Sequence, residues 1–114
     1  MLSSKLQTLL LSIVLVLTSA LSLYGQSTYG TVDGTVADST GAVVAGAEVT
    51  LTNTGTQEKH TQPTSSSGAY QFVNVIPGQY RLDITKAGFK HFARTNVVVQ
   101  VQQDTHIDLS LIHI

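Results

Sequence analysis

The four histidines of this chain are the side chains best suited to bind a transition metal or to transfer a proton near neutral pH. A catalytic zinc site needs three protein ligands in a tetrahedral arrangement, often two or four residues apart on one element. No histidine here has a second histidine at either spacing. We therefore expect surface histidines and no metal site at His60, His91, His106 and His113.

The seven acidic residues are the next candidates, because carboxylate oxygens are ligands of Ca²⁺. They are Asp33, Asp38, Glu48, Glu58, Asp83, Asp104 and Asp108. Asp38 and Asp104 form the most suggestive pair, since each is expected in a turn. A calcium loop concentrates Asp and Asn within one short segment, and no segment here does so. Structural roles in turns explain these residues better.

No pattern for covalent catalysis or phosphate binding is present. The chain has no cysteine and no Gly-x-Ser-x-Gly segment, and no glycine-rich loop precedes a predicted helix. Serine and threonine are abundant, but strand propensity and turn chemistry account for them. The sequence therefore predicts no catalytic residue and no cofactor.

Charge argues against a nucleic-acid partner. The net charge is −1 at pH 7, whereas phosphate binding needs clustered lysine and arginine side chains. The basic residues that follow Lys5 are instead scattered along the chain, at Lys59, Arg81, Lys86, Lys90 and Arg94.

Aromatic side chains could form a surface on which sugars stack. Five of them occupy alternating positions or bends of predicted strands, which is more typical of a core: Tyr70, Phe72, Tyr80, Phe89 and Phe92. Burying one such side chain stabilises a domain by roughly 1.5–3 kcal/mol. We therefore expect these rings inside the domain.

The elements that position these residues are strands, because apolar and polar residues alternate from Thr28 onward. We expect Val49 and Leu51 to point inward and Thr50 and Thr52 outward. The predicted strands are 31–37, 47–53, 69–75, 79–86, 96–101 and 106–112, with 57–64 as an edge strand or a loop. About seven strands with turns every 8–12 residues or so are typical of a sandwich.

Glycine and proline mark the predicted turns. Asp38 to Gly41 forms a turn in which Asp38 binds the backbone and glycine supplies a positive φ. Pro77-Gly78 fits the central pair of a type II turn. Pro63 cannot donate a ladder hydrogen bond, which favours an edge strand or a loop for its segment.

The first 25 residues are predicted to be a secretory signal peptide, and residues 26–114 the domain. Lys5 precedes a short apolar run, Leu9–Leu17, and small residues follow it. Cleavage after Ala20, Ser22 or Gly25 is compatible with this pattern. The alternative is a retained anchor, but the run is shorter than the roughly 20 residues of a membrane span.

The order of the turn and core residues resembles the carboxypeptidase regulatory-like domain, a transthyretin-like or immunoglobulin-like β-sandwich. The resemblance covers residues 30–111 and is carried by Asp38/Gly41, Gly46/Val49/Leu51, Gly68/Tyr70/Phe72, Pro77-Gly78/Tyr80 and Gly88-Phe89. It is strongest to the versions found at the N-terminus of TonB-dependent outer-membrane receptors. It implies an all-β antiparallel sandwich that follows a signal helix.

The resemblance also implies a function without catalysis. We expect an exported accessory module in the periplasm, attached to the barrel of an outer-membrane receptor if the chain is a fragment. The alternative is a secreted, stand-alone module that binds carbohydrate or protein. A metallocarboxypeptidase accessory domain is less favoured, because such a domain follows the catalytic one, whereas here the predicted signal peptide directly precedes the sandwich. The sequence does not indicate an oligomeric state.

Overall fold

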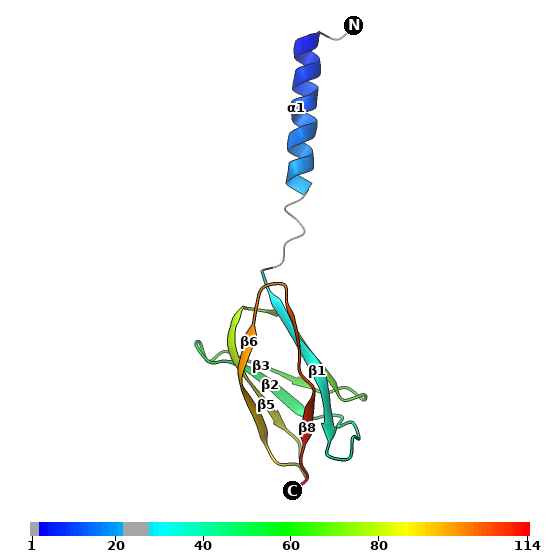
Figure 1. The fold of residues 1–114 in the computed structure, drawn as a ribbon, viewed down its shortest axis with the longest axis vertical. Helices are drawn as coiled ribbons and strands as arrows, with labels where there is room; N and C mark the ends of the chain where they lie inside the picture. Colours follow the sequence, from blue (N-terminus) through cyan, green and yellow to red (C-terminus); the bar gives the residue numbers. More distant parts are fainter. Residues whose placement is uncertain (1–2, 22–27) are drawn as a thin grey trace.

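The computed structural model describes residues 3–21 and 28–114. In these residues one helix, α1 (Ser4–Leu21), precedes eight strands (Figure 1). The strands are β1 (Gly30–Asp38), β2 (Glu48–Asn53), β3 (Lys59–Pro63), β4 (Ala69–Val75), β5 (Gly78–Thr85), β6 (Phe92–Val99), β7 (Asp104–His106) and β8 (Leu109–Leu111). The predicted all-β sandwich is confirmed.

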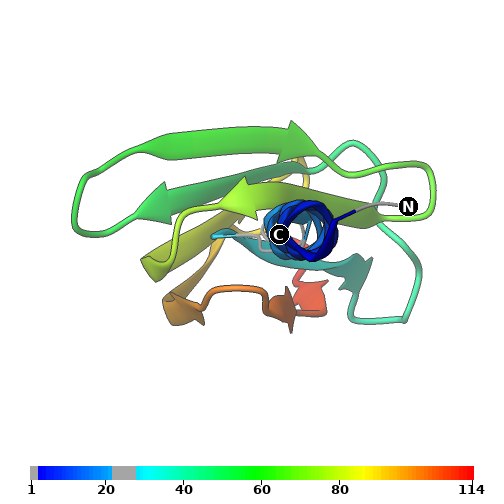
Figure 2. The same cartoon turned by 90° about the horizontal axis from the view of Figure 1, so that it is seen from above.

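The strands form two four-stranded sheets. One has the order β4-β1-β7, with β8 also paired to β1, and the other has the order β3-β2-β5-β6. Edge strands β3 and β4 belong to different sheets, yet they run side by side and are joined by the short loop of residues 64–68 (Figure 2). This loop therefore closes one side of the sandwich.

The space between the sheets is filled by the alternating apolar residues. Val32, Val36, Val49, Leu51, Leu82, Ile84 and Leu111 are completely buried. Tyr70, Phe72 and Tyr80 are also buried in this core, and Phe89 and Phe92 pack against it while partly exposed. The expected core position is thus confirmed for Tyr70, Phe72 and Tyr80, whereas Phe89 and Phe92 lie at the edge of the core.

One residue expected to face outward is buried. Thr52 is only 3% exposed, and its hydroxyl has no hydrogen-bond partner among the described residues. It lies on a central strand, opposite Lys59 on one neighbour and Arg81 on the other. The aliphatic stems of long basic side chains commonly cover such a position. Thr52 is therefore buried, although alternation places it on the same face as Thr50, which is partly exposed.

The first strand and the last two strands are parallel. Thr31 lies opposite Asp104 and Asp38 lies opposite Leu111. The sheet that contains β1 is therefore mixed, and the chain enters the sandwich at one end and finishes at the other (Figure 1). The last predicted strand is interrupted at Ile107 and Asp108, which separate β7 from β8.

The turn predicted at Pro77-Gly78 differs from expectation. A type II turn needs a φ near +80° at its third residue, but Gly78 has a φ of 158° and begins β5. The chain extends directly into the strand. Segment 57–64, in contrast, forms edge strand β3, which is one of the two expected alternatives.

The N-terminal helix matches the apolar segment of the predicted signal peptide. The leucine side chains between Leu6 and Leu17 are exposed, including Leu11 at 71% and Leu15 at 72%. Among the described residues, no helix has the combined length and apolarity needed to cross a membrane. The proposed boundary between residues 25 and 26, and the cleavage positions after Ser22 and Gly25, lie outside the described residues.

Candidate functional site

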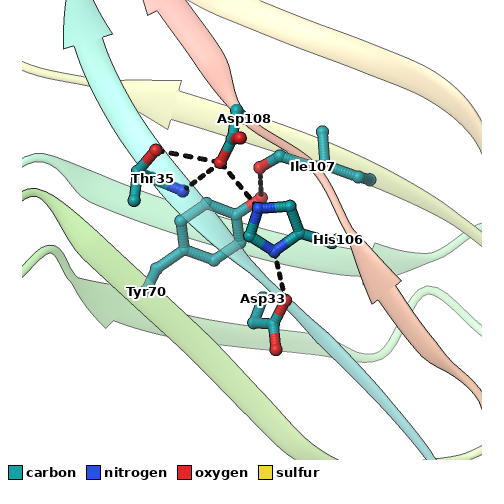
Figure 3. Close-up of polar contacts among 6 residues, drawn as sticks. All are labelled: Asp33, Thr35, Tyr70, His106, Ile107 and Asp108. Carbon is teal, nitrogen blue, oxygen red and sulfur yellow. Dashed lines mark hydrogen bonds and ion pairs between the residues drawn. The ribbon is translucent and has the colours of Figure 1, made fainter.

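A polar cluster lies where the last strand is interrupted (Figure 3). The ring of His106, at the end of β7, sits between two carboxylates. Its Nδ1 is 2.8 Å from Oδ1 of Asp33, and its Nε2 is 3.0 Å from Oδ1 of Asp108. Asp108 also accepts hydrogen bonds from Thr35, at 3.0 Å from the backbone N–H and 2.9 Å from the hydroxyl. The hydroxyl of Tyr70 donates to the carbonyl of Ile107 at 2.5 Å.

The local sequence explains why the cluster forms here. β1 pairs with β7 as far as Asp33 and with β8 from Val36 onward. Between these two ladders, Gly34 lets the Ile107 carbonyl approach the backbone of β1, because a Cβ at Gly34 would lie 1.8 Å from that oxygen. The Asp108 carboxylate then accepts a hydrogen bond from the Thr35 N–H, in the place where a carbonyl of the neighbouring strand would accept it in a regular sheet.

The cluster shifts several ionisation equilibria. Hydrogen bonds to Asp33 and Asp108 raise the pKa of His106, because both favour the charged ring. Hydrogen bonds from Thr35 lower the pKa of Asp108. The hydrogen bond that Asp104 makes with Asp33 raises the pKa of Asp104. Burial raises the pKa of Tyr70. Charged His106 therefore stabilises the contact between β1 and β7.

This geometry has little catalytic capacity. A histidine that acts as a general base needs one ring nitrogen near the proton that it removes. Both nitrogens of His106 instead contact carboxylates. The same two carboxylates lie on opposite edges of the ring, so the three side chains do not converge on one ion. Among the described residues, no group of three His, Cys, Asp or Glu side chains is arranged to hold a metal.

We expect the cluster to make stability depend on pH. The pKa of His106 is raised, so its contribution is full below its ordinary value of 6.5 and is lost as pH rises through the folded value. The pKa of Asp104 is also raised, so the ionisation of Asp104 beside Asp33 also weakens the fold as the pH rises. The pKa of Asp108 is lowered, so its contribution is lost only as pH falls below 3.8.

The urea concentration at the unfolding midpoint of the wild type should therefore decrease as the pH is raised from about 5.5 to about 8. His106→Gln should flatten this fall. His60→Gln is the matched control, because its ring is equally exposed, 59% against 60%, but contacts the single carboxylate of Glu58. An unchanged slope in His106→Gln would contradict the assignment.

The other histidines also lie beside carboxylates. His60 contacts Glu58 at 3.2 Å, His91 contacts Asp83 at 3.1 Å, and His113 contacts Asp38 at 3.3 Å. All four rings are at the surface, as expected, but these partners were missed. Two of the histidine–carboxylate contacts could have been predicted from the sequence, because Glu58 and His60, and likewise His106 and Asp108, are two residues apart.

Asp38 and Asp104, the suggestive calcium pair, are not brought together. Asp104 lies beside the start of β1 and Asp38 ends that strand. Asp38 instead caps its turn, with Oδ1 accepting from the Thr40 hydroxyl at 2.6 Å and from the N–H groups of Thr40 and Ala42. These hydrogen bonds, first among them that from the Thr40 hydroxyl, lower the pKa of Asp38 to about 2.

A groove between β3 and β4 is the other candidate site. It has a volume of about 650 Å³ and is lined by polar side chains over an apolar floor. The side-chain oxygen of Gln62 on β3 accepts from the N–H of Gln71 on β4 at 2.8 Å, which ties the two edges together. Phe72 and Tyr80 contribute to the lining from the core. Sequence reasoning missed this groove, because its two walls belong to different sheets.

Comparison with known proteins gives a family. Residues 31–112 match the family model described as the carboxypeptidase regulatory-like domain. No curated protein matches the chain.

Solved structures share the fold. A Bacillus anthracis protein called TIE superposes with a TM-score of 0.65 at 18% identity, over 76% of this chain and 17% of that one. A candidate carbohydrate-binding protein from Bacteroides uniformis gives 0.60 at 22% identity, over 73% and 41%. A minor pilin of Streptococcus agalactiae gives 0.62 at 16% identity, over 78% and 46%. The chain thus spans less than half of each of these proteins.

Dioxygenases share the same architecture more distantly. Wild-type catechol 1,2-dioxygenase of Acinetobacter radioresistens superposes with a TM-score of 0.58 at 10% identity, over 75% of this chain and 53% of that one. At such identities the similarity concerns the fold and not the activity.

Proposed function

Since the chain belongs to the carboxypeptidase regulatory-like domain family, we propose that it is an exported, non-catalytic β-sandwich module and that it serves as the N-terminal accessory domain of a TonB-dependent outer-membrane receptor. The observation that carries this proposal is the position of the family match, residues 31–112, which follows an apolar N-terminal segment with one basic residue, Lys5. Such a segment is typical of a secretory signal. The lack of a free base or nucleophile at His106 supports a role without catalysis.

Export can be tested in a Gram-negative host that expresses the whole chain. We expect a periplasmic product whose mass corresponds to cleavage after Ala20, Ser22 or Gly25. A Leu11→Arg/Val14→Arg double variant should accumulate as the uncleaved form in the cytoplasm, because two charges disrupt the apolar segment that the export machinery recognises. Lys5→Arg keeps the basic charge and should be processed normally. A full-length cytoplasmic wild type would contradict export.

The receptor context needs a separate test. Reading the gene beyond the codon for Ile114 should reveal a continuing frame with a TonB box, a plug and alternating barrel strands. A reproducible stop codon at that point would remove the receptor role and would leave the exported module.

A carbohydrate-binding module is the second candidate function. The groove between β3 and β4 favours it, because its volume of about 650 Å³ lies within the range of small-molecule sites. The structural similarity to a candidate carbohydrate-binding protein is consistent with this function. A panel of soluble oligosaccharides tests it directly, with a protein partner as the competing outcome.

A further inference from the structure

We propose that the groove between β3 and β4 is a binding site for a neutral oligosaccharide. This inference rests on the second candidate function and is independent of the receptor context. The groove lies where the two edge strands separate beyond the Gln62–Gln71 hydrogen bond. Its walls come from β3 and β4, which belong to different sheets and are linked by this hydrogen bond.

The polar lining suits hydroxyl groups. Four amide side chains line the groove, those of Asn53, Gln62, Gln71 and Asn74. A primary amide presents a donor and an acceptor together, which matches two neighbouring sugar hydroxyls. The oxygen of Gln62 is held by the N–H of Gln71, so its orientation is defined and its NH₂ group is left to donate to a ligand.

The apolar lining suits the faces of a sugar ring. Tyr29 lines the groove with 44% of its surface exposed, and Val73 and Ile76 are exposed beside it at 59% and 55%. An exposed tyrosine combines an apolar ring face with a polar tip. Phe72 and Tyr80 are buried and close the floor. The hydroxyl groups of a sugar can form hydrogen bonds with the polar wall, while its apolar ring face packs against the exposed tyrosine.

The charge of the groove favours a neutral ligand. Glu58 is the one acidic side chain among the described lining residues, and it contacts the ring of His60 at 3.2 Å. Neither lysine nor arginine lines the groove in the part of the chain that the structure describes. Phosphorylated or uronic acid ligands need cationic side chains, of which arginine gives the strongest pairing. An anionic polymer is therefore disfavoured here.

The edges of the groove are poorly suited to an extended peptide, which binds a sheet edge through free backbone N–H and C=O groups. The register of β2 with β3 turns Lys59, Thr61 and Pro63 outward, and Pro63 has no N–H. On β4, the N–H groups of Ala69 and Gln71 are occupied by the Ser65 hydroxyl and the Gln62 amide.

A bulge completes the protection of β4. Asn74 has a φ of 55°, and the register with β1 shifts between Gly30 and Val32. Bulges of this kind bend an edge away from a flat pairing geometry. Pro63 on β3 and the occupied N–H groups and bulge on β4 thus reduce the backbone groups available for strand addition.

The purified chain should be titrated with maltohexaose, cellohexaose, mannohexaose and xylohexaose, with an oligogalacturonate and an extended peptide as competing probes. Binding is measured by calorimetry and by the backbone NMR shifts of β3 and β4. We expect one neutral oligosaccharide to bind and to shift these strands. Gln71→Leu should weaken binding about three- to tenfold, the loss of one or two hydrogen bonds. Tyr29→Ala should weaken it about tenfold, through lost ring contact.

Gln79→Leu is the matched control, because it makes the same change at an exposed position of β5 that does not line the groove. It should bind as the wild type does, and circular dichroism melts should show that all variants are folded. Binding that Gln71→Leu and Tyr29→Ala both leave intact would overturn the site but not the carbohydrate function. Absence of binding to any oligosaccharide would overturn both, and binding only to the galacturonate or the peptide would overturn the neutral ligand.

Discussion

Gly34→Ala should destabilise the domain more than any other single-methyl addition that we consider, by at least about 3 kcal/mol. The new Cβ would lie 1.8 Å from the carbonyl oxygen of Ile107, 2.6 Å from its carbonyl carbon and 2.8 Å from the hydroxyl oxygen of Tyr70. Two of these atoms belong to the backbone and cannot rotate away. The segment between β7 and β8 must therefore move off β1, which also breaks the hydrogen bond from Tyr70 to Ile107.

Urea denaturation of Gly34→Ala and Gly41→Ala measures this effect and separates two causes. Gly41 has a φ of +88°, but nothing lies within 4 Å of its added Cβ. Alanine there introduces dihedral strain alone, which we expect to cost about 1–2 kcal/mol. Equal destabilisation of the two variants would show that the close approach at Gly34 is not the source of the effect.

The alternation of apolar residues was enough to predict the sandwich and most of its inward faces. Val32, Leu51 and Leu82 are completely buried, because side chains on a strand point to opposite faces in turn. Thr52 shows the limit of this rule, since it shares a face with the partly exposed Thr50 and is nevertheless buried. Alternation reports which face a residue lies on, but not what covers that face.

Contacts between distant segments could not be read in the same way. The pairing of β1 with β7 depends on the fit of Gly34 against Ile107, and the Asp33–His106 contact joins residues 73 positions apart. Histidines were judged by the spacing of histidine to histidine, which overlooked carboxylates on adjacent strands. The groove has the same origin, because Gln62 and Gln71 meet only after the two sheets have packed.

These long-range contacts bear on the function. The histidine and carboxylates of the polar cluster join β1 to β7 and β8, so these side chains serve to stabilise the fold. The groove, in contrast, brings several amide side chains together at the surface between two edge strands. Function in this domain is therefore better sought along the β3–β4 side than among its titratable residues.

Leu82→Ala should lower the free energy of unfolding by about 2–5 kcal/mol. Leu82 is completely buried, opposite Leu51 in the sheet, so truncation leaves a cavity as well as losing apolar burial. A domain with about 5–15 kcal/mol of stability should still fold with this variant. Equilibrium urea unfolding measures the difference, and an unchanged slope with denaturant would indicate that the native state keeps its compactness.

Thr50→Ala is the control for this core prediction, because Thr50 lies on the face of β2 opposite to that of Val49 and Leu51. Its side chain is partly exposed, and its hydroxyl pairs with that of Thr61 at 3.1 Å near the surface. We expect a loss of about 1 kcal/mol or less. If Thr50→Ala were the more destabilising of the two, the inward and outward faces would be exchanged. A one-residue shift of register would have that effect, since it would place every leucine and valine of β2 in solvent.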